Sequence, residues 1–379
     1  MISPKEEKRI TNTRFTCIVM ATFLKKLKNR PQKLLVARTD RIGDFVLTLP
    51  FFEVLHRELG ISFSVLCQEL VTPLLQNNPY VDEIITIGPG KERGELLREI
   101  QSKGFDGLLV LVNDKFILDL LPALKFIPTR IGPLSKPKTL LYYTHPVLQK
   151  RSRSIRNEAE YNLELLEIFG LANFILPRPK FHFSDNEIKD FLEKLPSLTR
   201  LQNPPSSWII LHAGMQGSAL NWNEGNYREL LQRMLAEGKT VMLTGAGEQE
   251  KQLNQRLLQG IQNEFPDLLY DMSGKLSLRE LAILLHLADL FIGPSTGPTH
   301  IANAAGTPLI SFYPPIQVQS KIRWQPFLAE SKIFVPAVHC GQKYRCIGER
   351  CQDFYCMDLI TPDQVFQQVK KMLGDSQKL

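Results

Sequence analysis

The chain has 379 residues, of which 43% are hydrophobic and 22% charged, with a formal net charge of +7. This length exceeds one ordinary core and the composition is globular, so we expect two domains rather than a disordered or fibrous chain. The charge favours anionic partners such as phosphates, nucleotides or an acidic membrane surface. No apolar run reaches the ~18 residues that a membrane-spanning helix needs.

The first apolar segment is FTCIVMATFL at 15–24, followed by KKLKNR. It is too polar for a signal peptide and lacks a small-residue cleavage site. Two interpretations of residues 1–32 stay open: a loose N-terminal extension, or a membrane-surface anchor whose cations face acidic lipid. The cations in question are Lys25, Lys26, Lys28 and Arg30.

From residue 33 onward, predicted strands alternate with predicted helices. KLLVA at 33–37 is a buried strand, and the helical pattern at 44–60 ends at Gly60. The elements expected next are strands at 61–67 and 81–87, a helix at 93–105, a strand at 106–112 and a helix at 157–170. Such alternation predicts a parallel sheet with helices on both faces, so we assign 33–190 to a Rossmann-like domain.

A polar, proline-rich stretch predicts an interdomain linker at 191–206, after which the pattern restarts. Strands are expected at 208–214, 239–245, 268–272, 289–293 and 308–314, with helices at 226–238, 248–261, 277–288 and 297–306. These elements predict a second Rossmann-like domain over 207–340. A cysteine-containing segment and an amphipathic helix occupy 341–379. Two such domains bind ligands at the carboxyl ends of their strands.

Two glycine-bearing turns in the second domain are candidates for a nucleotide site. TGAGEQE at 244–250 has Gly245 and Gly247, but Glu250 replaces the third glycine of a dinucleotide fingerprint, so that match is weak. Glu248 is read either as a carboxylate for a ribose hydroxyl or as a helix-start charge favoured by the dipole.

The second turn, GPSTGPTHIANAAG at 293–306, leads from a strand directly into a helix. Unpaired backbone N–H groups at Ser295, Thr296 and Gly297 can hold a diphosphate without a lysine. Thr299 adds a hydroxyl, and His300 lies one turn into the helix. The alternative is a helix cap over a buried histidine, but two glycines and two prolines at a strand end favour ligand binding.

RTDRIGDFVLTLP at 38–50 follows the first strand of the first domain. Asp44 stands at a helix start, where it is either a capping carboxylate or a general base for an acceptor hydroxyl. Arg38 and Arg41 would offset the charge of an anionic acceptor.

These motifs together resemble glycosyltransferase family 9, the ADP-heptose:lipopolysaccharide heptosyltransferases and their relatives. The resemblance runs from about Leu34 to the end and includes HAGMQGSALNW, LTGAGEQE, the 293–306 segment and CMDLI. It implies an α/β GT-B fold, with two Rossmann-like domains facing across a cleft. It also implies inverting, metal-independent transfer of a sugar from a nucleotide diphosphate, without a cofactor.

The resemblance assigns roles to particular residues. Asp44 takes the place of the family's proposed catalytic base, and Arg38 and Arg41 remain the expected acceptor contacts. The expected donor-binding residues are Gly214, Ser218, Glu248, Lys275, Leu276, Ser295, Thr296, Gly297, Thr299 and His300. The implied donor is ADP-heptose or a related sugar nucleotide, and the acceptor a lipopolysaccharide core or another lipid-linked glycan.

One departure from the family concerns Leu220, since relatives usually offer a lysine or arginine there to the donor phosphate. Ser218, the backbone at Gly217, or Lys275 could substitute. Because of Leu220, a non-catalytic sugar-nucleotide or glycan-binding protein stays open. A GT-B sugar-nucleotide epimerase or hydrolase also stays open, since it would use the same donor loop. We expect no nucleic-acid partner, because no motif interleaves aromatic and basic residues.

Two further segments have open interpretations. The basic stretch QKRSRSIR at 149–156 is either a solvated loop or a surface for a phosphorylated acceptor. Cys340, Cys346, Cys351 and Cys356 are spaced more loosely than the C-x2-4-C pairs of zinc sites, so a shared structural feature is favoured over a metal. Thiols clustered in this way suggest a reducing compartment, and we expect a cytoplasmic enzyme, peripheral at the inner membrane.

Overall fold

The computed structural model describes residues 14–16, 22–23, 27–134, 137–171, 173–199, 207–215, 217 and 220–376. Two compact units divide the chain, one formed by Ile2–Ser152 with Arg156–His182 and the other chiefly by Phe183–Leu379. The boundary at His182 precedes the expected linker at 191–206. The reason is that helix α7 (Asp185–Thr199) is held in the second unit by ion pairs from Glu187 to Arg279 and from Lys194 to Glu280.

The first unit is built on a seven-stranded sheet in the order β2-β8-β7-β6-β3-β4-β5. The strands are β2 (Thr22–Phe23), β3 (Lys33–Ala37), β4 (Ser62–Gln68), β5 (Glu83–Ile87), β6 (Gly107–Val110), β7 (Thr129–Pro133) and β8 (His145–Leu148). All pairings are parallel except that of β2 with β8. From β3 to β8 the arrangement is the Rossmann order 3-2-1-4-5-6, whose direction reverses between β3 and β6. A separate antiparallel pair joins β1 (Arg14–Thr16) to β9 (Asn173–Ile175).

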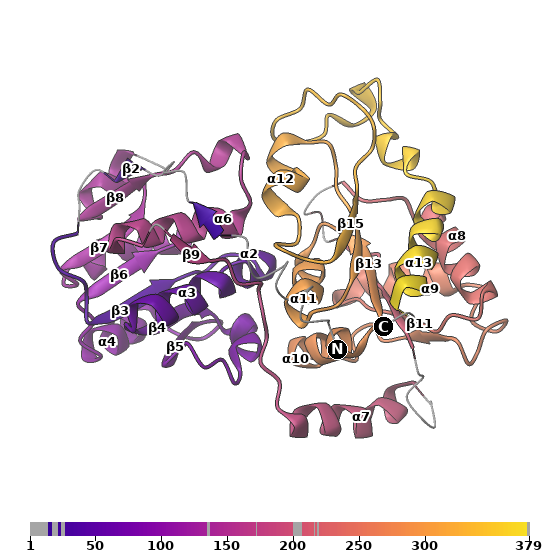
Figure 1. Ribbon diagram of the computed structural model, residues 1–379, viewed down its shortest axis with the longest axis horizontal. Helices are drawn as coiled ribbons and strands as arrows, with labels where there is room; N and C mark the ends of the chain where they lie inside the picture. Colours follow the sequence, from indigo (N-terminus) through magenta and orange to yellow (C-terminus); the bar gives the residue numbers. More distant parts are fainter. Residues whose placement is uncertain are drawn as a thin grey trace. The chain divides into compact units, whose positions relative to one another are not determined.

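Helices and short 3-10 turns connect these strands, as Figure 1 shows. They are α2 (Ile42–Val46), α3 (Leu49–Leu59), η1 (Glu69–Leu75), α4 (Arg93–Ser102), α5 (Lys115–Leu120), η2 (Leu121–Leu124), η3 (Pro137–Leu141), η4 (Arg151–Arg153), α6 (Glu158–Leu163) and η5 (Glu164–Phe169). The helix expected at 44–60 is two helices, because Pro50 at the start of α3 has no N–H to continue the hydrogen bonding of α2. The stop at Gly60 is confirmed, with φ +60°.

The second unit contains a six-stranded, wholly parallel sheet in the order β12-β11-β10-β13-β14-β15. The strands are β10 (Ile209–Leu211), β11 (Val241–Leu243), β12 (Leu269–Asp271), β13 (Leu290–Pro294), β14 (Leu309–Phe312) and β15 (Ser331–Phe334). This is again the Rossmann order, with the reversal between β10 and β13. Strand β15 was not expected from the sequence, since SKIF is short and only partly buried.

The helices of the second unit are α7, α8 (Glu224–Ala236), α9 (Gly247–Leu258), α10 (Leu278–Leu287), α11 (Gly297–Ala305), η6 (Gln317–Gln319), α12 (Lys321–Trp324), η7 (Gly348–Arg350), η8 (Cys356–Leu359) and α13 (Pro362–Ser376). Helix α13 packs on α8 and β13. Met357, Ile360 and Val365 enter the same core cluster as β10 and α8. The C-terminal segment therefore completes the core of this unit.

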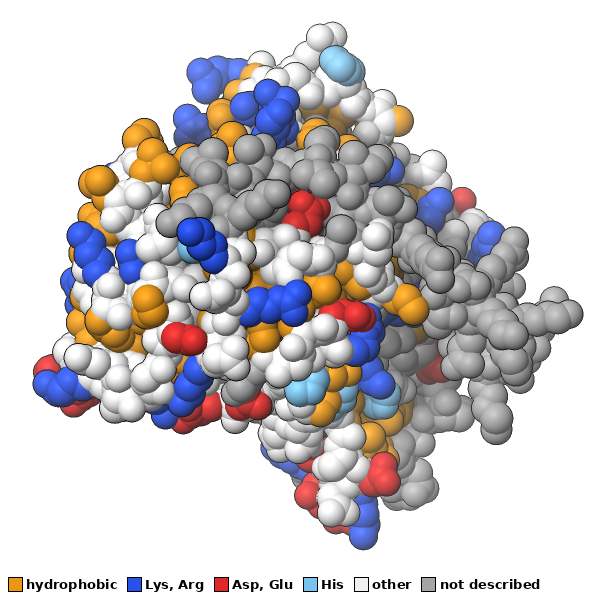
Figure 2. Space-filling model, turned by 60° about the vertical axis from the view of Figure 1, so that its left-hand side comes forward, with side chains coloured by type: hydrophobic (Ala, Val, Ile, Leu, Met, Phe, Trp, Pro, Cys, Tyr) orange, Lys and Arg blue, Asp and Glu red, His pale blue; other side chains and the backbone are white. Residues whose placement is uncertain are grey.

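Charged and hydrophobic side chains are intermixed on one face of the molecule. On the face shown in Figure 2, lysines and arginines are distributed among acidic, apolar and uncharged side chains. Within the described part of the chain, no helix combines the length and hydrophobicity needed to cross a bilayer.

Trp222 ties the C-terminal segment to the second sheet. Its ring stacks on Phe312 at 4.5 Å between centroids, and its Nε1 donates to the carbonyl of Ile360 at 2.7 Å. The side chain is 2% exposed, so water cannot replace this hydrogen bond. We predict that Trp222→Phe leaves the Ile360 carbonyl unpaired and lowers the free energy of unfolding by about 1–3 kcal/mol.

Urea denaturation followed by circular dichroism measures this loss. Trp324→Phe is the matched control, since Trp324 Nε1 also donates to a carbonyl at 2.7 Å, that of Val318, but lies half-exposed where water can substitute. An equal loss in both variants would contradict the role given to Trp222.

Candidate functional site

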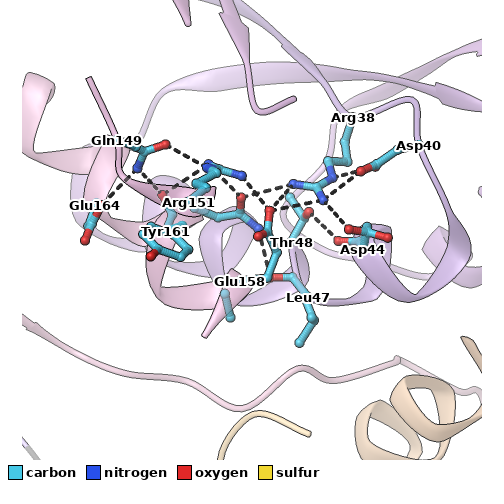
Figure 3. Close-up of polar contacts among 12 residues, drawn as sticks. Arg38, Asp40, Asp44, Leu47, Thr48, Gln149, Arg151, Glu158, Tyr161 and Glu164 are labelled. Carbon is cyan, nitrogen blue, oxygen red and sulfur yellow. Dashed lines mark hydrogen bonds and ion pairs between the residues drawn. The ribbon is translucent and has the colours of Figure 1, made fainter. Parts of the chain in front are cut away.

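The loop after β3 places a buried arginine among carboxylates at the point where the strand order reverses. Arg38 is 1% exposed. Its Nε and Nη2 donate to the two oxygens of Asp40 at 2.7 and 2.9 Å, and Nη2 also donates to Asp44 Oδ1 at 3.0 Å (Figure 3). Asp44 lies in the first turn of α2 with its side chain 17% exposed. One guanidinium thus orients two carboxylates that both reach the surface.

A third carboxylate and a second guanidinium lie behind Arg38. Glu158, whose side chain is 1% exposed, accepts from Arg38 Nη1 at 3.3 Å and from Arg151 Nη1 at 2.5 Å (Figure 3). Asn162 accepts from Arg38 Nη1 at 3.2 Å and donates to the carbonyl of Leu47, which fastens α2 to α6. We call Arg38, Asp40, Asp44, Arg151 and Glu158 the Arg38 cluster.

The charge of Arg38 is maintained by its neighbours. Burial alone would lower its pKa, but the carboxylates of Asp40, Glu158 and Asp44 outweigh burial and raise the pKa above its ordinary value. Arg38 therefore stays a cation across the physiological range.

This placement changes the role expected for Arg38. From the sequence, Arg38 was expected to contact the acceptor. Its guanidinium is instead buried beneath Asp44 and binds carboxylates of the protein. Arg41, at the N-cap of α2, is exposed as an acceptor contact requires. In the 149–156 stretch, Arg151 and Arg156 are paired with Glu158 and Glu164, so much of this positive charge is compensated inside the protein.

In the second unit, the loop after β13 leads into α11. Ser295, Thr296 and Gly297 are half-buried, and Thr296 is the N-cap residue in extended conformation. Thr299 is fully buried, and its hydroxyl donates to the carbonyl of Pro294. The Thr299 hydroxyl therefore shapes the loop. The N–H of Ser295 was expected to be unpaired, but it donates to the carbonyl of Phe312 at 3.1 Å, because Ser295 continues the pairing of β13 with β14. The capacity to bind an anion therefore rests on the N–H groups of the first helical turn.

His300 lies beneath this loop, 4% exposed, and its Nδ1 has no hydrogen-bond partner within the described residues. Burial lowers its pKa to about 4, so the ring is neutral near pH 7. A neutral imidazole can donate or accept one hydrogen bond but adds no positive charge.

The ends of β10 and β11 bring Gly214 against Glu250. A Cβ at Gly214 would lie 2.4 Å from Glu250 Cδ, so any other residue there would require the Glu250 side chain to move. Glu250 is 6% exposed and accepts from the N–H of Ala246 at 2.7 Å. Glu248, the expected ribose carboxylate, is exposed and accepts from Gln252. In the sequence, Glu250 stood out only because it replaces a glycine of the dinucleotide motif. A contact between two loops that are distant along the chain produces no pattern in the local sequence.

The other expected donor residues lie on neighbouring loops. Lys275 is exposed and Leu276 half-buried in the turn before α10, and Lys275 borders an open hollow of about 730 Å³ along α9. Ser218 lies outside the described residues. Leu220 packs against the core cluster of the second unit, so this position faces inward.

The late cysteines lie in the segment that completes the second core. Burial and the nearby thiols of Cys346, Cys340 and Cys351 raise the pKa of Cys356. Cys346 Sγ accepts from the N–H of Gly348 at 3.3 Å. Across the residues that the structure describes, no group of three or more His, Cys, Asp or Glu side chains is arranged to hold a metal ion.

Known proteins share both the sequence pattern and the fold. The profile of glycosyltransferase family 9 (heptosyltransferase) matches residues 94–348. A Haemophilus influenzae protein with a glycosyltransferase name is 31% identical over 309 residues, covering 78% of this chain and 86% of its own. Lipopolysaccharide heptosyltransferase 3 of Escherichia coli is 24% identical, covering 75% and 83%.

Among solved structures, ADP-heptose lps heptosyltransferase II of E. coli superimposes with a TM-score of 0.74 at 21% identity, covering 91% of this chain and 99% of its own. The fold and the two switch-point loops define a GT-B glycosyltransferase. The chain belongs to glycosyltransferase family 9, the heptosyltransferase family.

Burial of neutral His300 makes the protein sensitive to acid. Its folded pKa of about 4 lies below the unfolded value of about 6.5, so the unfolded state binds more protons between these two values. The free energy of unfolding therefore decreases as the pH is lowered. We predict that from pH 7.5 to 5 the wild type loses about 2 kcal/mol more stability than His300→Gln.

Urea denaturation at the two pH values gives the slope of the free energy of unfolding against pH. This slope tests the prediction whatever the stability of the variant at pH 7.5. His286→Gln, at an exposed histidine of the same unit, is the control and should keep the wild-type slope. Equal slopes for the wild type and His300→Gln would contradict it.

Proposed function

We propose that this chain transfers heptose or a related sugar from ADP to a hydroxyl of a lipopolysaccharide core or similar glycan, with inversion and without a metal ion. The observation that carries this proposal is Asp44, a half-buried carboxylate at the strand-order reversal, held through one oxygen by a buried arginine. The name of the E. coli neighbour, an ADP-heptose heptosyltransferase, supports the donor and the sugar.

In the proposed reaction, Asp44 accepts the proton of the attacking hydroxyl as its oxygen bonds to the anomeric carbon. A single displacement of this kind inverts the configuration at that carbon. The Arg38 guanidinium keeps Asp44 ionised and oriented before the acceptor arrives. Arg41 is the proposed cation for an anionic acceptor.

The bond from the anomeric carbon to the diphosphate breaks in the same step, and ADP leaves with its charge increased. We assign the diphosphate to the N-terminal turn of α11 beside Ser295, where the backbone N–H groups that begin at Thr296 and Gly297 can stabilise the developing charge; the N–H of Ser295 itself donates to the carbonyl of Phe312. His300 can donate one uncharged hydrogen bond there. Because Leu220 packs inward, the exposed Lys275 is the proposed nearby cation.

The acceptor and the place of action follow from the same proposal. A lipopolysaccharide core is assembled on a lipid, so we propose a cytoplasmic enzyme that works at the inner face of the membrane. Lys150 and Arg153 are exposed beside the paired arginines and are available to an anionic acceptor.

We predict that Asp44→Asn lowers kcat for transfer by about 10²–10⁴-fold and leaves KM for the donor within a few fold, since the amide cannot take the proton. The measurement is ADP release from ADP-heptose with a heptose-deficient lipopolysaccharide core as acceptor. Asp40→Asn is the comparison, because Asp40 shares Arg38 but is assigned no proton transfer. A greater loss in Asp40→Asn would assign the base to Asp40.

The donor is tested by thermal stabilisation with ADP-, GDP- and UDP-sugars. We expect a selective rise in Tm with ADP-heptose in both the wild type and Asp44→Asn, because ligand binding stabilises the folded state in proportion to ln(1 + [L]/Kd). Equal stabilisation by the ADP-, GDP- and UDP-sugars would contradict the proposal that the donor is an ADP-sugar. Release of free sugar without an acceptor would instead favour a hydrolase.

A further inference from the structure

We infer that Glu158 and Arg151 are positioning residues for the reaction: through Arg38 they set the orientation and acidity of Asp44. This inference rests on the proposed role of Asp44 as the base. It concerns one residue on α6 and one on η4, which lie behind the buried arginine (Figure 3).

The contacts form a chain of alternating charge. Asp44 Oδ1 is 3.0 Å from Arg38 Nη2, Arg38 Nη1 is 3.3 Å from Glu158 Oε1, and the same Glu158 oxygen is 2.5 Å from Arg151 Nη1. Because the Glu158 oxygen accepts from both guanidiniums, any change in its pairing with Arg151 changes its hold on Arg38. Arg38 in turn divides its donors among three carboxylates.

Burial makes these charges interact strongly. The side chains of Arg38 and Glu158 are 0% and 1% exposed, whereas Asp44 is 17% exposed. Water therefore screens the inner members of the cluster little, and their charges are felt at Asp44. The cluster contains two guanidiniums and three carboxyl groups, and burial raises the pKa of one of these carboxyls, that of Asp40.

Hydrogen bonds also fix the position of this series of charged side chains in the fold. Glu158 opens α6, whose N-cap Asn157 forms a capping box with Glu160. One turn later, Asn162 binds both guanidiniums and the carbonyl of Leu47 at the end of α2. The helix that carries Asp44 and the helix that carries Glu158 are thus joined at two points.

We expect the removal of Glu158 and the removal of Arg151 to shift the pKa of Asp44 in opposite directions. Glu158→Gln removes a negative charge and leaves Arg38 more fully to the aspartates, so the pKa of Asp44 should fall. Arg151→Gln removes a positive charge and lets Glu158 draw Arg38 away, so the pKa of Asp44 should rise. We expect shifts of about 0.5–1 pH unit in each direction.

The sign holds only if every charge near Asp44 is considered. Among the described residues, the charged groups on the elements near it include Arg38, Asp40 and Arg41 on its own loop, Glu158 on α6, Arg151 on η4, and Asp114 at the start of α5, which accepts from Thr39. Both substitutions leave the groups on the loop and on α5 in place.

The experiment follows the side-chain carboxyl carbon of Asp44 by NMR in protein labelled with ¹³C at its aspartate carboxyls, titrated with acid. The signal is assigned by its loss in Asp44→Asn. The acid limb of kcat/KM against pH, measured with ADP-heptose and the truncated core, should move with the NMR midpoint. A purely structural role would lower Tm and activity in both variants without moving the midpoint in opposite directions.

The chain supplies a matched control pair. Arg156 and Glu164 are 3.0 Å apart with side-chain exposures of 14% and 1%, the same exposures as Arg151 and Glu158. Glu164→Gln and Arg156→Gln should shift the Asp44 midpoint by less than about 0.2 pH unit, because Glu164 is linked to Arg151 through the uncharged Gln149 rather than through a shared guanidinium. Glu158→Asp keeps the negative charge, so its Asp44 midpoint should stay close to that of the wild type.

The outcomes separate this inference from the proposed function. Opposite midpoint shifts in Glu158→Gln and Arg151→Gln support it, and no shift, or shifts of the same sign, overturns it. If Glu158→Gln does not fold, the sign of the Arg151→Gln shift alone decides. Retained transfer in Asp44→Asn would overturn the base assignment, and the NMR result would still report on the charge chain.

Discussion

The burial of the Arg38 guanidinium is the constraint around which the first unit's site is arranged. A cation removed from water is costly unless carboxylates and hydrogen bonds surround it. The chain meets this requirement with Asp40 and Asp44 from the following loop and Glu158 from a helix more than a hundred residues away. The catalytic carboxylate proposed here is thus part of the solution to a burial problem, which explains why it is held so firmly.

The second unit handles charge in a different way. The start of α11 at Thr296 and Gly297 offers backbone N–H groups, and the nearby His300 is kept neutral by burial. Leu220 packs into the core rather than supplying a cation. The proposed site in one unit therefore depends on charged side chains buried together, and the proposed site in the other on the backbone N–H groups and dipole of a helix start.

Several features of both units were predictable because they depend on short-range patterns. The strand at 33–37 is apolar after Lys33, and Gly60 ends its helix in the left-handed region. The turns at 244–250 and 293–306 join strand to helix as their glycines indicate. Other features were not. β15 is too short and exposed for a pattern, and the break between α2 and α3 depends on one proline within an otherwise continuous helical period.

What the sequence by itself determined is the kind of protein: alternating elements require parallel sheets, and the motifs at 38–50 and 293–306 identify family 9 and mark the loops at the strand ends. Only the tertiary structure decided which way the side chains in those loops face. It turned Arg38 inward to Glu158, placed Glu250 rather than Glu248 against Gly214, and paired Arg151 and Arg156 with carboxylates. The reason is physical: local periodicity is set by neighbours along the chain, whereas the partner of a buried charge is chosen by residues that only folding brings near.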